Sequence, residues 1–178
     1  LRQFPGLQPL PHEGQVLTLA LPAPHDYGLS RNWSSRLDLF RWNENSHPLW
    51  AIRAMYDWNY YLPGNQGKRL MRSPQNALRL TWLNAHFSNP VLLCQVRHPF
   101  AVCEGIRRRQ GLSIQQAVNH WYKSNEIMLQ DLNRVENGHL IRYEDLCDNP
   151  LDTISTIQQV LQLEEPGPEA VLAQTQQS

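Results

Sequence analysis

Hydrophobic residues in this chain follow two patterns, short apolar runs and longer stretches with helical spacing. The short runs are bounded by turn residues or polar clusters, which is typical of strands in a buried sheet. We expect three β-strands, within residues 68–74, 88–96 and 138–146. The opening residues, 1–15, predict the end of a helix followed by turns and an extended piece.

Helical spacing of apolar residues predicts five helices, and sequence signals mark where three of them begin. Pro99 opens one helix, and Ser113 with Gln116 forms a capping box for the next. Asn149 is the expected N-cap of the last helix, with Pro150 at its first position. The predicted helices are 47–62, 75–87, 97–109, 111–132 and 150–163.

The order of these elements is strand, helix, strand, helix, helix, strand, helix. This alternation predicts a mostly parallel sheet covered by helices on both faces, a three-layer α/β fold. The chain has 178 residues, of which 41% are hydrophobic, so a single domain spanning 1–178 can bury a core of ordinary size.

Charge and cysteine content narrow the classes of function. Sixteen basic side chains balance sixteen acidic ones, so no global field favours nucleic acid, and any anion site must be local. No stretch approaches the ~20 consecutive apolar residues of a membrane span, and no signal peptide is evident. The three cysteines, Cys94, Cys103 and Cys147, lack metal-binding spacing and mildly favour a reducing compartment.

Arg97 is the first candidate for local anion binding, because it lies between a predicted strand and a predicted helix. Ligands of open α/β sheets bind at the carboxyl ends of strands, where an arginine presents a forked, permanently charged donor to phosphate. A surface ion pair is the equally ordinary alternative. Arg72 ends an earlier strand at the same expected edge, and Arg109 lies one helical turn after Gly105.

Other polar residues at these turns have simpler interpretations beside functional ones. Tyr143 either stacks on a planar ligand or fills the core, and Glu144 is more typical of a cap or bridge than of catalysis. Glu13 lies beside a glycine, where a carboxylate near arginines is a candidate general base. The histidines show no metal-ligand spacing, which argues against a zinc site.

Four motifs in order give the chain a resemblance to the sulfotransferases that use 3′-phosphoadenosine 5′-phosphosulfate (PAPS). "RLMRSPQNALRLTWLNAHFSNPVLLCQVRHPFAV" resembles the family's strand, K-S-P-type turn, helix, strand and R-[DH]-P run. "VNHWYKSNEIMLQDL" resembles its H-W…E helix, and "LIRYEDLCDNPLDTISTIQQVLQL" is similar to its R-Y-E-D-L strand and helix. "PHEGQ" resembles the acidic turn after the first helix. The resemblance implies a P-loop-like fold and transfer of a sulfuryl group from PAPS to a hydroxyl or amine without a metal.

The resemblance also implies roles for residues that match the family's motifs. Arg97 matches the arginine that binds the 3′-phosphate of PAPS, and Arg109 matches a basic residue at the same site in protein-tyrosine sulfotransferases. Tyr143 matches a tyrosine that lines PAPS. Arg72 replaces the usual lysine near the transferring sulfate, and Glu13 matches the catalytic carboxylate of those relatives.

Two further departures from the family's pattern are visible. Gly105 replaces a serine that donates to the 3′-phosphate, so its backbone N–H is the expected substitute, at a loss of ~1 kcal/mol. The glycine-rich loop that binds the 5′-phosphosulfate is expected upstream of Leu1, because the chain opens like the tail of the helix that follows this loop. The fold is therefore expected to be incomplete at its N-terminus, and the chain alone is expected to be inactive.

Two alternatives to an active sulfotransferase are a non-catalytic homologue that binds a nucleotide or partner and a P-loop nucleotide kinase, although no GK[ST] sequence is present. The acceptor is open among carbohydrate, peptide tyrosine and small metabolite. Segment 16–66 is the expected variable acceptor side, with aromatic residues Trp33, Trp42, Trp50, Trp58, Tyr60 and Tyr61. The composition favours a cytosolic enzyme, whereas the acceptor sequon at 32–34 is the feature that points to a Golgi-type lumen.

Overall fold

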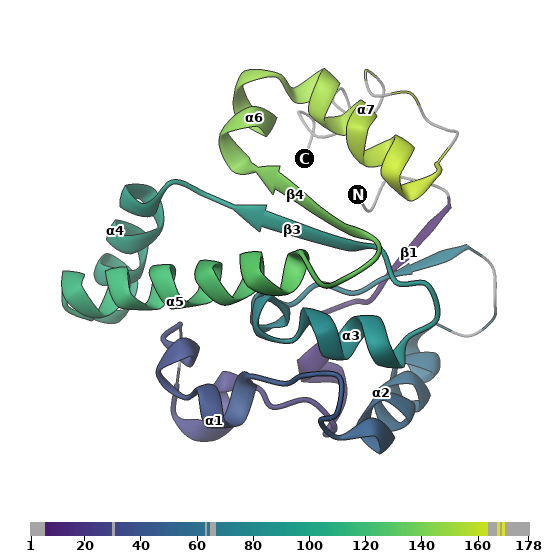
Figure 1. Cartoon of the computed structure of the whole chain (residues 1–178), viewed down its shortest axis with the longest axis horizontal. Coiled ribbons are helices and arrows are strands. Elements are labelled where there is room, and N and C mark those ends of the chain that lie inside the picture. The colour runs from purple at the N-terminus through teal and green to yellow at the C-terminus, as the bar shows by residue number, and fades with distance from the viewer. Residues whose placement is uncertain are drawn as a thin grey trace.

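The computed structural model describes residues 6–29, 31–62, 64, 67–163, 167 and 169 (Figure 1). The expected helix tail at the start of the chain lies outside these residues. The strands are β1 (Leu7–Pro9), β2 (Lys68–Leu70), β3 (Leu92–Val96) and β4 (Gly138–Arg142). The α-helices are α1 (Leu37–Phe40), α2 (Pro48–Tyr61), α3 (Leu80–His86), α4 (Pro99–Gln110), α5 (Ile114–Leu132), α6 (Tyr143–Asp148) and α7 (Pro150–Leu161).

All strand pairing within the described residues is parallel, as expected, and it forms two two-stranded sheets. β1 pairs with β2, and β3 pairs with β4 in a register that places Cys94 opposite Leu140. In Figure 1 the four strands run in the same general direction, toward the side where α4 lies. Their carboxyl ends therefore face the same side of the molecule, the side on which an α/β sheet presents ligand sites.

Alternate residues of β3 pack into different cores, which gives the three-layer arrangement. Leu92 and Cys94 belong to the larger core with Met128 of α5, and burial raises the pKa of the Cys94 thiol to about 11. Leu93 faces the other way, into a smaller core with Ile154 of α7. Figure 1 shows the β3–β4 pair between α5 on one side and α6 and α7 on the other. Successive side chains of β3 point to opposite faces of the sheet, and each face is covered by helices.

All three helices begin where the sequence signals predicted, α7 at Pro150 with Asn149 at its N-cap position, but one expected side-chain cap is absent. α4 begins at Pro99, and the Ser113 hydroxyl accepts a hydrogen bond from the Gln116 N–H at 3.2 Å, completing the predicted capping box. The Asn149 side chain does not cap α7. Its carbonyl instead accepts from the Thr153 N–H at 3.1 Å, and α7 ends at Leu161 rather than at 163.

Two predicted elements are divided in the structure. The expected helix 75–87 begins as a 3₁₀ helix, Pro74–Leu78, and becomes the α-helix α3 only at Leu80. The expected strand 138–146 ends at Arg142, opposite the last residue of β3, and the chain turns directly into α6. A strand extends only as far as its partner supplies hydrogen bonds, so the end of β3 sets the end of β4.

Segment 31–42 is attached to α5 by buried polar contacts. The Ser34 hydroxyl lies 2.7 Å from Nδ1 of His120, and burial lowers the pKa of His120 to about 4, so this imidazole is neutral. The Arg41 guanidinium pairs with the fully buried Asp131 carboxylate, with one nitrogen–oxygen distance of 2.7 Å. These contacts fix residues 31–42, a part of the expected acceptor-side segment, against α5.

Candidate active site

Arg97 lies at the carboxyl end of β3, as expected, with an exposed side chain. Its guanidinium carbon lies 4.3 Å from the centroid of the Tyr143 ring at the start of α6. A cation held over an aromatic face at this distance is attracted by the ring's quadrupole. Tyr143 therefore supports the guanidinium from one side and leaves its N–H donors free for a ligand.

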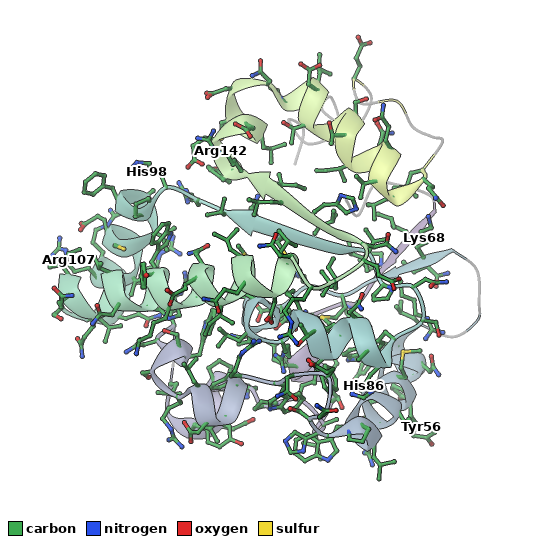
Figure 2. All side chains as sticks on the ribbon, viewed as in Figure 1. Tyr56, Lys68, His86, His98, Arg107 and Arg142 are labelled. Atoms are coloured by element: carbon green, nitrogen blue, oxygen red, sulfur yellow. The ribbon has the colours of Figure 1, made fainter. Side chains whose placement is uncertain are left out.

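Two neighbouring helices hold the peptide group between Arg97 and His98. Its carbonyl accepts a hydrogen bond from Nε1 of Trp121 at 3.0 Å, and its N–H donates to Oε1 of Glu144 at 2.9 Å. The bond from the His98 N–H is the main reason that the pKa of Glu144 lies below its usual value. Figure 2 shows His98 where β3 passes into α4. With both polar atoms of this peptide bonded, the backbone that carries the Arg97 side chain is fixed from α5 and α6.

α4 carries the other residues of the expected 3′-phosphate site. Gly105 is in the helix interior, and a Cβ built on it would meet nothing within 4 Å. Arg109 is exposed near the end of the helix. A cavity of about 670 Å³ lies between α4 and α5, and its lining includes Arg97 and Arg108 but not Arg109.

Glu13 and Arg72 lie at the carboxyl ends of the other strand pair. Parallel pairing continues past β1 and β2, with a hydrogen bond from the Leu10 N–H to the Leu70 carbonyl at 3.0 Å. The Gly14 N–H then donates to the Arg72 carbonyl at 3.1 Å, which brings the two candidate residues onto adjacent backbone segments. The Glu13 carboxylate accepts from Nε2 of the buried Gln15 at 2.5 Å, whereas Arg72 is exposed.

The turn after Glu13 is closely packed. The indole N–H of Trp58 in α2 donates to the Gly14 carbonyl at 2.9 Å. A Cβ at Gly14 would lie 2.4 Å from Cγ of Met71 and 3.2 Å from the Trp58 ring. Glycine is thus required here by close approach, since only a residue without a side chain fits between Met71 and Trp58.

The structure places four of the six predicted site residues at the carboxyl ends of parallel strands, Glu13 and Arg72 in one group and Arg97 and Tyr143 in the other. Gly105 and Arg109 lie further along α4, in its interior and near its end. Within the described part of the chain, Arg72, Arg97 and Arg109 have no carboxylate at ion-pair distance. Most other arginines are paired with a carboxylate, namely Arg36, Arg41, Arg53, Arg107, Arg108, Arg134 and Arg142. Unpaired guanidinium groups beside strand ends are available to bind an anionic ligand.

Four residues that support the site were not assigned this role from sequence. Trp121 was visible only as part of the H-W motif, Trp58 only as one of several aromatic residues, and Gln15 only as part of the "PHEGQ" turn. Glu144 was expected to cap or bridge, and it does bridge two elements. Each contact joins residues that are far apart in sequence, apart from the bond between Gln15 and Glu13.

No group of three or more histidine, cysteine, aspartate or glutamate side chains among the described residues is arranged to hold a metal ion. None of the helices in the described part of the chain has the length and apolar character needed to cross a membrane.

Comparison with known proteins decides the family. The model of the sulfotransferase family matches residues 23–167, which include Arg72, Arg97 and Tyr143. The chain belongs to the sulfotransferase family. Glu13 lies before the matched residues.

Among solved structures, the sulfotransferase domain from the curacin biosynthetic pathway is similar, with a TM-score of 0.53 and 26% sequence identity. The match covers 64% of this chain and 44% of that one, so the chain spans less than half of that domain. A search of curated proteins found no match. The expected sulfotransferase fold and family are both confirmed.

Proposed function

We propose that this sulfotransferase uses PAPS as its sulfuryl donor and transfers the sulfuryl group to a hydroxyl or amine. The observation that carries the proposal is Arg97, an unpaired guanidinium at the end of β3 whose peptide is held by Trp121 and Glu144. An arginine with its donors free and its backbone fixed is suited to a phosphate dianion. Arg109 is the proposed partner of Arg97 at the 3′-phosphate, with Tyr143 beside PAPS. The backbone N–H of Gly105, which the sequence suggested as a substitute for the serine hydroxyl, lies in the interior of α4, where the helix's own hydrogen bonding uses it.

The proposed chemical step uses the residues after β1 and β2. Glu13 accepts the proton of the acceptor hydroxyl or amine as the acceptor atom attacks sulfur, and the bond between sulfur and the phosphate oxygen of PAPS breaks. Arg72 neutralises charge on the transferring sulfate and the leaving phosphate. The hydrogen bond from Gln15 and the close packing of Gly14 support this role, because they hold the Glu13 carboxylate near the backbone of Arg72.

The expected acceptor segment 16–66 provides two different sets of aromatic residues. Trp33, Trp42 and Trp58 are buried and belong to the core. Trp58 also fixes the Gly14 turn through its indole N–H. Trp50, Tyr60 and Tyr61 are exposed on α2 and are the ones free to contact an acceptor. A small molecule, a carbohydrate or a peptide tyrosine each presents a ring that these side chains can stack on.

Calorimetric titration of the full-length protein with 3′-phosphoadenosine 5′-phosphate tests the proposal. Arg97→Ala is expected to weaken binding by about 100-fold or more, because it removes charge-assisted hydrogen bonds to a phosphate. Arg142→Ala is the matched control, since Arg142 ends the neighbouring strand β4 and pairs with Asp145. Equal affinity of Arg97→Ala and the parent protein would contradict the proposed donor site.

A non-catalytic homologue is the second candidate, and Gly105 favours it, because it removes a hydroxyl donor from the 3′-phosphate site. Incubation of the full-length protein with PAPS and a panel of phenol, sugar and amine acceptors separates the two candidates. Tight binding of 3′-phosphoadenosine 5′-phosphate without turnover on any acceptor is the outcome expected of the non-catalytic homologue. The family match favours both of these over the nucleotide kinase.

A further inference from the structure

Helix α2 is apolar on two opposite faces. Its inner face is buried through Ala51, Ala54 and Trp58, and the Trp58 indole donates to the Gly14 carbonyl. Its outer face carries apolar and aromatic residues that are 67% to 84% exposed, namely Leu49, Ile52, Tyr56 and Tyr60. A helix that is apolar on every side is normally buried on every side, so the outer face is expected to be covered in the working protein.

The four outer residues form one continuous row, which we call the α2 stripe. Their spacing of three, four and four residues places them on one face of the helix, each within a turn of the next. Figure 2 shows Tyr56 at the outer edge of the molecule, and Figure 1 shows α2 far from α4. A partner on the α2 stripe therefore leaves the Arg97 end of the molecule open.

The α2 stripe is complementary to itself when a second copy of the helix runs antiparallel to it. A two-fold axis near the middle of α2 places Leu49 of one copy opposite Tyr60 of the other. The same axis places Ile52 opposite Tyr56, so each aromatic ring meets an aliphatic side chain. An apolar row that matches its own reverse is suited to a two-fold dimer.

Charges beside the α2 stripe select the same antiparallel arrangement. Arg53 and Asp57 pair within each chain at 2.9 Å, and the Arg53 side chain is 58% exposed. These two residues are equally far from Met55, so antiparallel copies oppose Arg53 of one to Asp57 of the other. Parallel copies would instead oppose like charges, which is unfavourable.

The size of the α2 stripe and the charge of the chain are compatible with self-association. Covering the four side chains in each of two copies removes roughly 1,000 Å² of surface from water, about the least that a specific interface buries. The formal net charge of the chain is zero, so no overall repulsion opposes a dimer.

We propose that a second copy of this chain packs antiparallel on the α2 stripe and forms a two-fold symmetric dimer. The dimer assigns Tyr60 to the interface rather than to the acceptor. Trp50 and Tyr61 lie to the side of the α2 stripe by helical spacing and stay available to an acceptor. The proposal depends on neither the sulfuryl donor nor the acceptor.

Sedimentation equilibrium of the full-length protein tests the dimer, which is expected to dissociate in the micromolar range because its interface is small. Ile52→Glu is expected to raise the dissociation constant by about 100-fold or more, because each dimer would bury the new charge twice. Leu151→Glu is the matched control, since Leu151 is exposed on α7. Circular dichroism of each variant checks that the monomer is folded, as expected for substitutions at exposed positions.

Adjacent tyrosines provide a second matched pair. Tyr60→Ala is expected to weaken the dimer by about 10-fold and Tyr61→Ala by less than about 3-fold, because only Tyr60 belongs to the α2 stripe. A parent protein that stays monomeric up to about 100 μM overturns the proposal, and its flotation with phosphatidylcholine vesicles would identify a lipid surface as the occupant instead. A dimer that Ile52→Glu and Leu151→Glu weaken equally overturns it as well, because the interface would then lie elsewhere.

Discussion

At the carboxyl end of each strand pair, a tryptophan indole N–H donates to a backbone carbonyl, but one of these hydrogen bonds is buried and the other is exposed. At the β1–β2 end, the indole N–H of Trp58 donates to the carbonyl of Gly14, and this bond is buried. At the β3–β4 end, the indole N–H of Trp121 donates to the carbonyl of Arg97, and this bond is exposed. A tryptophan thus fixes a backbone turn beside a candidate functional residue in both places.

The two ends also differ in how much space surrounds their candidate functional residues. The first end has no spare volume, because Met71 and Trp58 leave no room for a Cβ at Gly14. The second end is open, with a cavity beside Arg97 and free space at Gly105. A proposed general base needs a fixed position within the protein, whereas a residue that binds a large donor needs room for that donor.

Substitution of the two glycines gives the largest expected contrast between these ends. Gly14→Ala is expected to destabilise the protein by about 1–3 kcal/mol, because the new methyl group overlaps Met71 and must displace it. Gly105→Ala is the matched control, and it is expected to stabilise α4 by about 0.5–1 kcal/mol because alanine replaces glycine in a helix interior. Urea unfolding of both variants measures the difference. Similar stability of the two variants would remove the distinction between a crowded and an open end.

Local patterns were enough to predict most of the elements and their parallel arrangement. The helices α2, α5 and α7 and the strands β2, β3 and β4 fall within the predicted ranges, and α4 exceeds its range by one residue. Periodicity and start signals are properties of neighbouring residues, so local sequence was sufficient to predict these elements. The turn into α6 was missed, since "LIRY" is typical of a strand and the residues that follow it include no glycine or proline to mark the strand's end. The end of β4 is set by β3, more than 40 residues earlier, and the chain around β4 carries no sign of it.

The site was predictable in its charged residues but not in what holds them. Arginines after strands are visible in a sequence, and the structure places Arg72 and Arg97 at strand ends. The bond between Trp58 and Gly14 joins residues 44 positions apart, so Trp58 cannot be told from an ordinary core tryptophan before folding. The cavity beside Arg97 likewise exists only after α4 and α5 pack together, so its lining cannot be found from local sequence.

Replacement of each tryptophan by phenylalanine removes the indole N–H and tests these two hydrogen bonds. The expected effect on stability is intermediate between those of the other predictions. Trp58→Phe is expected to cost about 1–3 kcal/mol of stability, because the buried Gly14 carbonyl loses its donor. Trp121→Phe is expected to change stability by less than about 0.5 kcal/mol, because water replaces the indole at the exposed Arg97 carbonyl. Its effect should appear instead as weaker binding of 3′-phosphoadenosine 5′-phosphate, measured by calorimetry. A larger loss of stability in Trp121→Phe than in Trp58→Phe would reverse the comparison.

Substitution of Glu144 has the smallest expected effect on stability, and this effect is expected to disappear at acidic pH. The hydrogen bond from the His98 N–H lowers the pKa of Glu144 from its usual 4.5 in the folded protein, so the carboxylate stabilises the fold above that value. This contribution is lost as the pH falls through the lowered pKa. Glu144→Gln keeps the shape and an acceptor oxygen but not the charge, so its melting temperature should lie about 1–2 °C below the parent at pH 7. The gap should close as the pH falls through the lowered pKa, because the parent carboxyl becomes protonated there. Asp145→Asn is the adjacent control, since the only contact described for the Asp145 carboxylate is the exposed 3.6 Å ion pair with Arg142. A gap that stays constant as the pH falls from 7 through the lowered pKa would show that the Glu144 charge does not hold the Arg97 turn.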